Sequence, residues 1–188
     1  IYARANILTP QKGLLWRTFI APKLGREDES MTPAVQMAKK AKIPFEILEY
    51  SHDPHCAAYG EEAANVLGLA PAQVFKTLLV ATDKTHPPLA VALVPVDHQL
   101  NLKAVAKCLG QKKLQMADAD LAQKSSGYLV GGISPLAQKK QLPTLIDTTA
   151  QQFDKIYVSA GRRGLEICLA ANDLAKLCRG SFADIKTL

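Results

Sequence analysis

The 188-residue chain is long enough to bury a single-domain hydrophobic core without a disulfide or a metal ion to hold it together. Its hydrophobic content of 48% and charged content of 21% are ordinary for a globular protein, and no apolar run reaches the roughly 20 residues of a membrane-spanning helix. The net charge of +6 favours an anionic partner, whereas an aromatic content of 6% argues against a single-strand binder that stacks bases. Four scattered cysteines without a CxxC pair predict a cytoplasmic location.

Residues 1–30 differ from the rest of the chain. They contain prolines and glycines at short intervals and sustain no helical period. Met31 then opens a clear helix start, with Thr32 in the N-cap position and Pro33 at the first helical position. We therefore expect residues 1–30 to be an extension that is peripheral or outside the natural protein, and residues 31–188 to form the functional domain.

The remaining elements are predicted from periodicity and from capping residues. The apolar segments 74–80 and 89–95 flank a turn and predict a hairpin of buried strands. The alternation of short helices with hairpin-like strands predicts an α+β fold, a single domain with a mixed sheet flanked by short helices. The expected helices cover residues 32–42, 60–67, 101–109, 118–124 and 172–178, and the other expected strands cover 44–50, 112–116, 128–130, 142–146, 155–159 and 165–169.

Lys76 stands near the start of an apolar strand segment, VFKTLLV, at positions 74–80. Alternate residues of a strand share a face, so its ammonium shares a face with Val74, Leu78 and Val80. A charge on an apolar row needs a partner or a cavity. The spacing alone equally fits a lysine at the strand mouth whose ammonium reaches water.

The segment GGISP at 131–135 is the second unusual feature. Paired glycines permit backbone angles that other residues avoid, and their N–H groups can bind a phosphate or an oxygen on which negative charge develops. An ordinary turn explains the same glycines. The glycine patterns of dinucleotide-binding and triphosphate-binding loops are absent from the sequence.

Other polar residues give weaker signals. Glu166 lies off the core face of its strand, where it is either solvated or lines a cleft. The HDPHC segment at 52–56 lacks the second ligand pair that a zinc site needs. Cys56 follows His55 directly, but adjacency in sequence does not make Cys56 a nucleophile. Basic pairs at 112–113, Lys139-Lys140 and Arg162-Arg163 could outline a surface that follows a nucleic-acid backbone, although a solvated face explains each pair equally well.

Three motifs in order resemble the YbaK family of bacterial aminoacyl-tRNA deacylases, which is related to the editing domain of prolyl-tRNA synthetase. They are VFKTLL at 74–79, GGISPL with two lysines at 131–140, and VSAGRRGLEI at 158–167. The similarity begins at Met31 and runs nearly to the C-terminus. It implies a mostly antiparallel, barrel-like sheet and neither metal nor cofactor.

The resemblance also implies an activity and a set of site residues. It implies removal of cysteine from Cys-tRNA(Pro), with related activity on Cys-tRNA(Cys), by a protein that acts in trans. The expected partners are aminoacylated tRNA and prolyl-tRNA synthetase, and neither DNA nor a membrane. The expected catalytic residues are Lys76 and Gly131, the substrate-binding residues are Tyr50, Tyr59, Thr77, Gly132, Ser134, Ser159 and Glu166, and the candidates for tRNA contact are Lys139, Lys140, Arg162 and Arg163. Relatives can carry phenylalanine at Tyr59 and aspartate at Glu166.

For a cysteinyl ester, the resemblance implies that the substrate thiol attacks its own carbonyl and releases a thiolactone, so no protein nucleophile is needed. Two other interpretations remain open. The chain could be a non-catalytic adaptor of the same fold that binds tRNA or a synthetase, or a hydrolase in which Cys56 or Cys168 is the nucleophile.

Overall fold

The computed structural model describes residues 31–187, so the prediction for residues 1–30 lies outside the described part of the chain. This part forms the predicted α+β domain, with one mixed sheet flanked by short helices. The strands are β1 (Phe45–Glu49), β2 (Val74–Ala81), β3 (Ala90–Pro95), β4 (Gln115–Met116), β5 (Thr144–Asp147), β6 (Ile156–Arg162), β7 (Leu165–Leu169) and β8 (Gly180–Ala183). The helices are α1 (Pro33–Ala41), α2 (Tyr59–Leu67), α3 (Leu102–Cys108), α4 (Ala119–Ser126) and α5 (Ala171–Cys178), with short 3-10 helices at Pro71–Gln73 and Thr148–Gln152.

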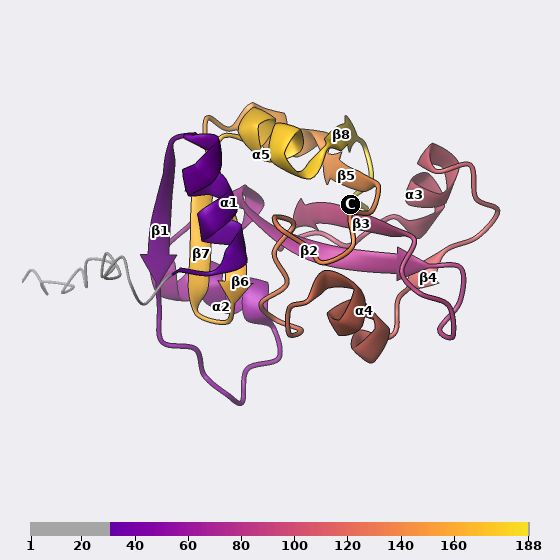
Figure 1. Ribbon diagram of the computed structural model, residues 1–188, viewed down its shortest axis with the longest axis horizontal. Helices are drawn as coiled ribbons and strands as arrows, with labels where there is room; N and C mark the ends of the chain where they lie inside the picture. Colours follow the sequence, from indigo (N-terminus) through magenta and orange to yellow (C-terminus); the bar gives the residue numbers. More distant parts are fainter. Residues whose placement is uncertain (1–30, 188) are drawn as a thin grey trace, which may run out of the picture.

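The sheet has the strand order β1-β7-β6-β2-β3-β5-β8, with β4 added beside β2. The pairs β1–β7, β6–β7, β2–β3 and β2–β4 are antiparallel, whereas β2–β6, β3–β5 and β5–β8 are parallel. In Figure 1, β1, β7 and β6 run upright while β2 and β3 run across them, so the sheet coils strongly along its length. The predicted mixed, mostly antiparallel sheet is confirmed.

Apolar side chains cover both faces of the central strands. In β3, Val91 and Leu93 belong to one core cluster, which also includes residues of α1 and α5. Ala92 and Val94 point the other way, into a second cluster with α3. A strand that is buried on both faces reads as a continuous apolar run, which explains the unbroken apolar segment at 89–95.

One edge of β2 is open in its middle. On its other edge β2 pairs with β3 from Phe75 to Val80. On this edge β6 pairs only with Val74 and Phe75, and β4 pairs only with Val80 and Ala81. The stretch from Lys76 to Leu78 therefore has no strand partner on that side, whereas the Leu79 carbonyl accepts from the Ala117 N–H just beyond β4.

The helix ends follow from local chemistry. The Thr32 hydroxyl accepts a hydrogen bond from the Val35 N–H, as predicted for the N-cap of α1. Asn101 and Asp118 cap α3 and α4 in the same way. Gly68 ends α2 in the left-handed conformation, which glycine adopts without strain.

Two local predictions were wrong, and one strand was not predicted. Residues 128–130 form no strand, because the Tyr128 N–H donates to the Ser126 hydroxyl and the Val130 N–H donates to the Gln123 side chain in place of a strand ladder. Helix α5 begins at Ala171, one residue before the expected cap at Asn172. The segment GSFA at 180–183 forms β8, which pairs in parallel with β5, although its short sequence gave no strand pattern.

No helix within residues 31–187 is long and apolar enough to cross a lipid bilayer.

Candidate active site

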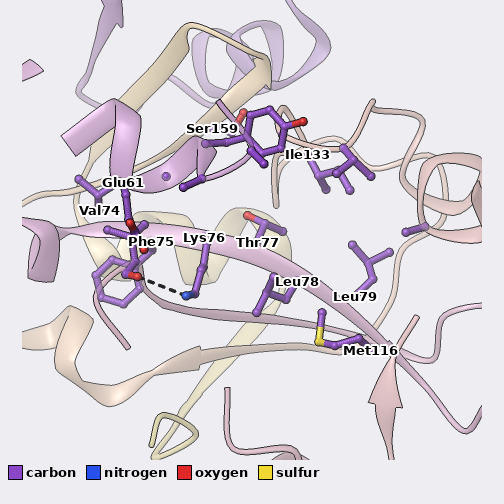
Figure 2. Close-up of a pocket in the computed structure, with 18 of the residues that line it drawn as sticks. Glu61, Val74, Phe75, Lys76, Thr77, Leu78, Leu79, Met116, Ile133 and Ser159 are labelled. Atoms are coloured by element: carbon purple, nitrogen blue, oxygen red, sulfur yellow. Dashed lines mark hydrogen bonds between the residues drawn. The ribbon is translucent and has the colours of Figure 1, made fainter. Parts of the chain in front are cut away.

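A cavity of about 380 Å³ lies at the open stretch of β2. Figure 2 shows the side chains of Lys76 and Thr77 on opposite sides of the β2 ribbon, so the cavity extends along both sides of the strand. The start of α2, the glycine turn at 130–131 and the β6–β7 hairpin provide the other walls. The lining residues are Ala57, Ala58, Tyr59, Gly60, Glu61, Val74, Phe75, Lys76, Thr77, Leu78, Leu79, Val96, Met116, Ala117, Ala119, Ala122, Val130, Gly131, Ile133, Ser159 and Glu166.

Lys76 lies inside this cavity. Its Nζ donates to the Val96 carbonyl at 3.3 Å, the contact drawn in Figure 2. Partial burial lowers the pKa of the ammonium, and the negative charges of Glu61 and Asp97 act in the opposite direction. No carboxylate of residues 31–187 lies within ion-pair distance of Lys76, so its charge is available to an anionic or polarised ligand.

Thr77 presents its backbone to the open edge of β2. The Val74 and Val80 carbonyls accept hydrogen bonds from the β3 side, from Val96 N–H and Leu89 N–H. Successive residues of an antiparallel strand direct their backbone groups to alternate edges, so Thr77 directs its N–H and carbonyl away from β3. Its Oγ1 is buried and has no hydrogen-bond partner within the described chain. Thr77 thus has three polar groups without a partner among residues 31–187 at the cavity, its backbone N–H, its carbonyl and its hydroxyl.

The glycine segment forms a tight turn. The Gly132 N–H donates to the Leu129 carbonyl at 2.9 Å, and Gly131 has φ +87 at the position of the turn where glycine is required. The N–H of Gly132 is therefore occupied, which corrects the expectation that both glycines offer free amides. The Gly131 N–H has no acceptor within residues 31–187 and remains available to a ligand.

Tyr59 packs tightly against this turn. A Cβ added at Gly131 would lie 2.7 Å from two carbons of the Tyr59 ring, so only glycine allows this approach. The Arg163 guanidinium lies 4.9 Å from the centre of the same ring, and the Arg163 Nε donates to the Val130 carbonyl at 2.9 Å. The ring of Tyr59 is also 5.4 Å from that of His52.

His52 is fixed in turn by Glu62 in the first turn of α2. The two Glu62 oxygens accept hydrogen bonds, one from the His52 ring and one from the Asp53 N–H, each at 2.6 Å. Glu62 is buried, and the pair anchors the loop that precedes α2. The sequence suggested a partial metal site for this histidine, but the structure gives it a role in holding the loop that leads to Tyr59 at the start of α2.

Glu166 lines the cavity and is only 7% exposed, which decides its two sequence-based alternatives in favour of the cleft. Burial raises the pKa of its carboxyl to about 8. It has no hydrogen-bond or ion-pair partner within residues 31–187. Ser159 lies directly opposite it in the β6–β7 register and also lines the cavity.

Three of the expected substrate-binding residues lie outside the cavity lining. Tyr50 follows β1; burial and then the charges of Glu166 and Glu62 raise the pKa of its phenol, so it lies near the cavity without lining it. Gly132 packs against the backbone of the β6–β7 turn, and a Cβ added at Gly132 would lie 2.8 Å from the Arg162 backbone. Ser134 is fully buried and its Oγ accepts from the Leu136 N–H. Gly132 and Ser134 therefore shape the loop.

The basic candidates for tRNA contact divide into two groups. Arg162 forms an ion pair with Glu49 on β1, and Arg163 is held against Tyr59 and Val130. Both guanidinium groups therefore have structural partners. Lys139 and Lys140 are exposed and follow the glycine segment, with their backbone N–H groups donating to the end of α4.

Cavity residues that the sequence did not single out are mainly apolar. Met116 is 40% exposed at the cavity, and Ile133 and Val96 add apolar surface. Such residues carry no sequence signal, because buried strands and loops contain them everywhere. None of Cys56, Cys108, Cys168 and Cys178 lines the cavity, which disfavours a cysteine nucleophile. The described residues contain no group of three or more His, Cys, Asp or Glu side chains that could hold a metal ion.

The sequence profile of the aminoacyl-tRNA editing domain matches residues 53–177. The chain belongs to this family. The matched segment includes the loop before α2, every residue that lines the cavity and nearly all of α5.

Relatives of this editing-domain protein fall into two groups. EbsC of Enterococcus faecalis, provisionally named a Cys-tRNA(Pro)/Cys-tRNA(Cys) deacylase, is 37% identical over 163 residues, which cover 86% of this chain and 97% of EbsC. A proline–tRNA ligase of Thermoanaerobacter sp. is 30% identical over 109 residues, but these cover 57% of this chain and only 19% of the ligase.

Among solved structures, a provisional trans-editing enzyme for prolyl-tRNA synthetase superposes with a TM-score of 0.70 over 84% of this chain and 99% of that protein. Its sequence identity is 18%, so this likeness concerns the fold alone. The editing-domain family resemblance predicted from the three motifs is thus confirmed, and the fold agrees with it.

Proposed function

We propose that the protein is a trans-acting deacylase that removes cysteine from Cys-tRNA(Pro) and also acts on Cys-tRNA(Cys). The observation that carries this proposal is the cavity at the open stretch of β2, which is lined by Lys76, Thr77 and Gly131 and by none of the cysteines of the described chain. The 37% identity with EbsC along nearly its whole length supports this choice of substrate.

The chemistry requires no nucleophile from the protein. The substrate Sγ attacks the carbonyl carbon of its own ester, a C–S bond forms, and the bond from that carbon to the ribose oxygen of the terminal adenosine breaks. The proton lost by the thiol ends on the departing ribose hydroxyl, and a thiolactone leaves. Because the attacking sulfur and the carbonyl carbon belong to one molecule held in the cavity, proximity lowers the activation free energy by several kcal/mol.

Each cavity group has a role in this proposal. The free N–H groups of Gly131 and Thr77 stabilise the carbonyl oxygen as negative charge develops on it. Lys76, which has no carboxylate partner, orients the ester or the neighbouring phosphate through its charge. The apolar wall formed by residues such as Ile133 and Val96 excludes water from the thiolate.

Recognition of the tRNA body depends on few groups of this chain. Arg162 and Arg163 already have structural partners, which leaves Lys139 and Lys140 as the exposed cations beside the glycine segment. We propose that a complex with prolyl-tRNA synthetase, in the cytoplasm, supplies the remaining tRNA specificity. The similarity to parts of proline–tRNA ligases supports this association.

The direct test is to incubate the protein with Cys-tRNA(Pro), with and without prolyl-tRNA synthetase, and to follow loss of the aminoacyl ester. Loss of the ester is expected, and an intact ester at micromolar protein would support the adaptor alternative. Ser-tRNA(Pro) should react far more slowly, because a hydroxyl is a much weaker nucleophile than a thiol. Equal rates would mean that water or a protein group attacks. Cys56→Ser and Cys168→Ser should remain active, and their inactivity would favour a protein thiol.

A further inference from the structure

Glu166 is a buried carboxyl group at the cavity without a partner. Of the two carboxylates that line the cavity, Glu61 is exposed, whereas Glu166 is 7% exposed. Glu166 forms neither a hydrogen bond nor an ion pair within the described chain. A buried ionisable group without a partner is costly for the folded protein, so a ligand that forms an ion pair or a hydrogen bond with it would gain a strong contact.

Lys76 is not the partner of Glu166. The two side chains form no ion pair, and the carboxylates that influence the pKa of Lys76 are Glu61 and Asp97. Glu166 extends from β7, whereas Lys76 extends from β2. The cavity therefore carries a cation and an uncompensated carboxyl group at separate positions, a pattern that matches a ligand with an anionic or polarised group and an ammonium group a few bonds apart.

We propose that Glu166 binds the free α-ammonium group of the aminoacyl moiety, so that the cavity accepts α-amino esters and rejects N-acylated ones. This inference rests on the proposed function and names the chemical class of its substrate. The ammonium stands on the carbon next to the ester carbonyl. Its capture at Glu166 directs that carbonyl toward the open stretch of β2, where Thr77 and Gly131 offer their N–H groups.

The surroundings of Glu166 support an ammonium over a second anion. Tyr50 follows β1 on one side of it, and burial, followed by the negative charges of Glu166 and Glu62, raises the pKa of the Tyr50 phenol. Burial raises the pKa of Glu166 itself, so the free carboxyl group is largely protonated near neutral pH. An arriving ammonium favours the ionised form and converts the group into an ion-pair partner.

The test is a double-mutant cycle between the protein and the substrate. Wild type and Glu166→Gln are each assayed on Cys-tRNA(Pro) and on N-acetyl-Cys-tRNA(Pro), which keeps the thiol and the ester but lacks the ammonium. For wild type, N-acetylation should lower kcat/KM about 10- to 100-fold, mainly through KM. Glu166→Gln should show a similar loss on Cys-tRNA(Pro) and only a small further loss on the N-acetylated substrate.

Two variants control for indirect effects. Glu166→Asp keeps the charge and should retain discrimination between the two substrates. Glu46→Gln removes an exposed carboxylate of β1, whose side chain is 64% exposed, and should leave both rates unchanged. An equal effect of Glu166→Gln on both substrates would overturn the proposal, because the carboxyl group would then act on something other than the ammonium.

A binding measurement keeps this inference separate from the proposed function. The probe is cysteinyl-adenosine with an amide in place of the ester, which cannot be cleaved, together with its N-acetylated form, studied by calorimetry. Wild type should bind the free amine more tightly, and Glu166→Gln should bind both forms equally weakly. If wild type cleaves no aminoacyl-tRNA but keeps this preference, the proposed function fails and the inference stands. No preference in wild type overturns the inference.

Discussion

The two edges of β2 show how one strand serves both stability and chemistry. Toward β3, the strand is paired from Phe75 to Val80, and the partner residues are fully buried and apolar. Toward β6 and β4, pairing is limited to its two ends. The unpaired middle contains Lys76 and the unsatisfied hydroxyl of Thr77. The paired edge holds the sheet together, and the unpaired middle of the other edge of β2 lies at the cavity.

The comparison predicts that truncation on the paired edge affects stability and not the chemistry. Leu93 of β3 is fully buried and belongs to the main core cluster. Leu93→Ala should lower the free energy of unfolding by about 4 kcal/mol, because it removes apolar contacts and leaves a cavity. Urea denaturation measures this change, and the deacylation rate per folded molecule should match wild type. A lower rate in fully folded protein would contradict the separation of the two edges.

Glu166 should make stability depend on pH. Its folded-state pKa of about 8 lies above its ordinary value of 4.5, so ionisation opposes folding. As pH rises from 5 to 8, the free energy of unfolding of the wild type should therefore fall by about 3 kcal/mol relative to that of Glu166→Gln. Urea denaturation of both proteins at pH 5, 6.5 and 8 tests this, and parallel pH profiles would show that the carboxyl group has a partner in solution.

A side chain at Gly131 should destabilise the glycine turn and impair the site. Gly131→Ala introduces a Cβ 2.7 Å from the Tyr59 ring at φ +87, and should cost about 2 kcal/mol of stability and reduce deacylation. Gly127→Ala is the matched control. Gly127 has φ +81, but its added Cβ would meet its nearest neighbour at 3.4 Å, so this variant should show backbone strain with full activity. Equal activity of the two variants would show that the turn at Gly131 has no part in catalysis.

The smallest effect on stability is expected at Thr77. Thr77→Val removes the buried hydroxyl that lacks a partner and keeps the side-chain shape, so stability should change by less than about 1 kcal/mol. We propose that this hydroxyl, beside the Thr77 N–H, also hydrogen-bonds the substrate, so deacylation should fall about tenfold. Thermal unfolding and single-turnover rates measure the two effects. A large loss of stability without a loss of rate would make the hydroxyl a structural group.

Much of the fold follows from the sequence because its signals are local. The capping residues Thr32, Asn101 and Asp118 fix helix starts, and the apolar runs at 74–80 and 89–95 fix the central hairpin. β8 escaped prediction because its strand character depends on parallel pairing with β5 and not on its own composition. The strand expected at 128–130 failed because side-chain hydrogen bonds satisfy that backbone.

The site was predictable where a residue is costly in its local context. Lys76 on an apolar strand lines the cavity, as does Glu166, which its strand pattern left either solvated or in a cleft and which only the family resemblance selected. Gly132 and Ser134 stand in the same motif as Gly131, yet only tertiary contacts show that they support the loop. The partners of Arg162 and Arg163 lie far away in sequence, at Glu49 and Tyr59, so their structural use could not be read from the chain.

The most direct test of the account is the single-turnover deacylation rate of wild type and Lys76→Ala on Cys-tRNA(Pro), with Lys155→Ala as a control. Lys155 forms an exposed ion pair with Glu46, outside the cavity lining. We predict that Lys76→Ala is folded and loses at least about 100-fold in rate, whereas Lys155→Ala keeps the wild-type rate. Wild-type deacylation by folded Lys76→Ala would contradict the placement of the active site at the open stretch of β2.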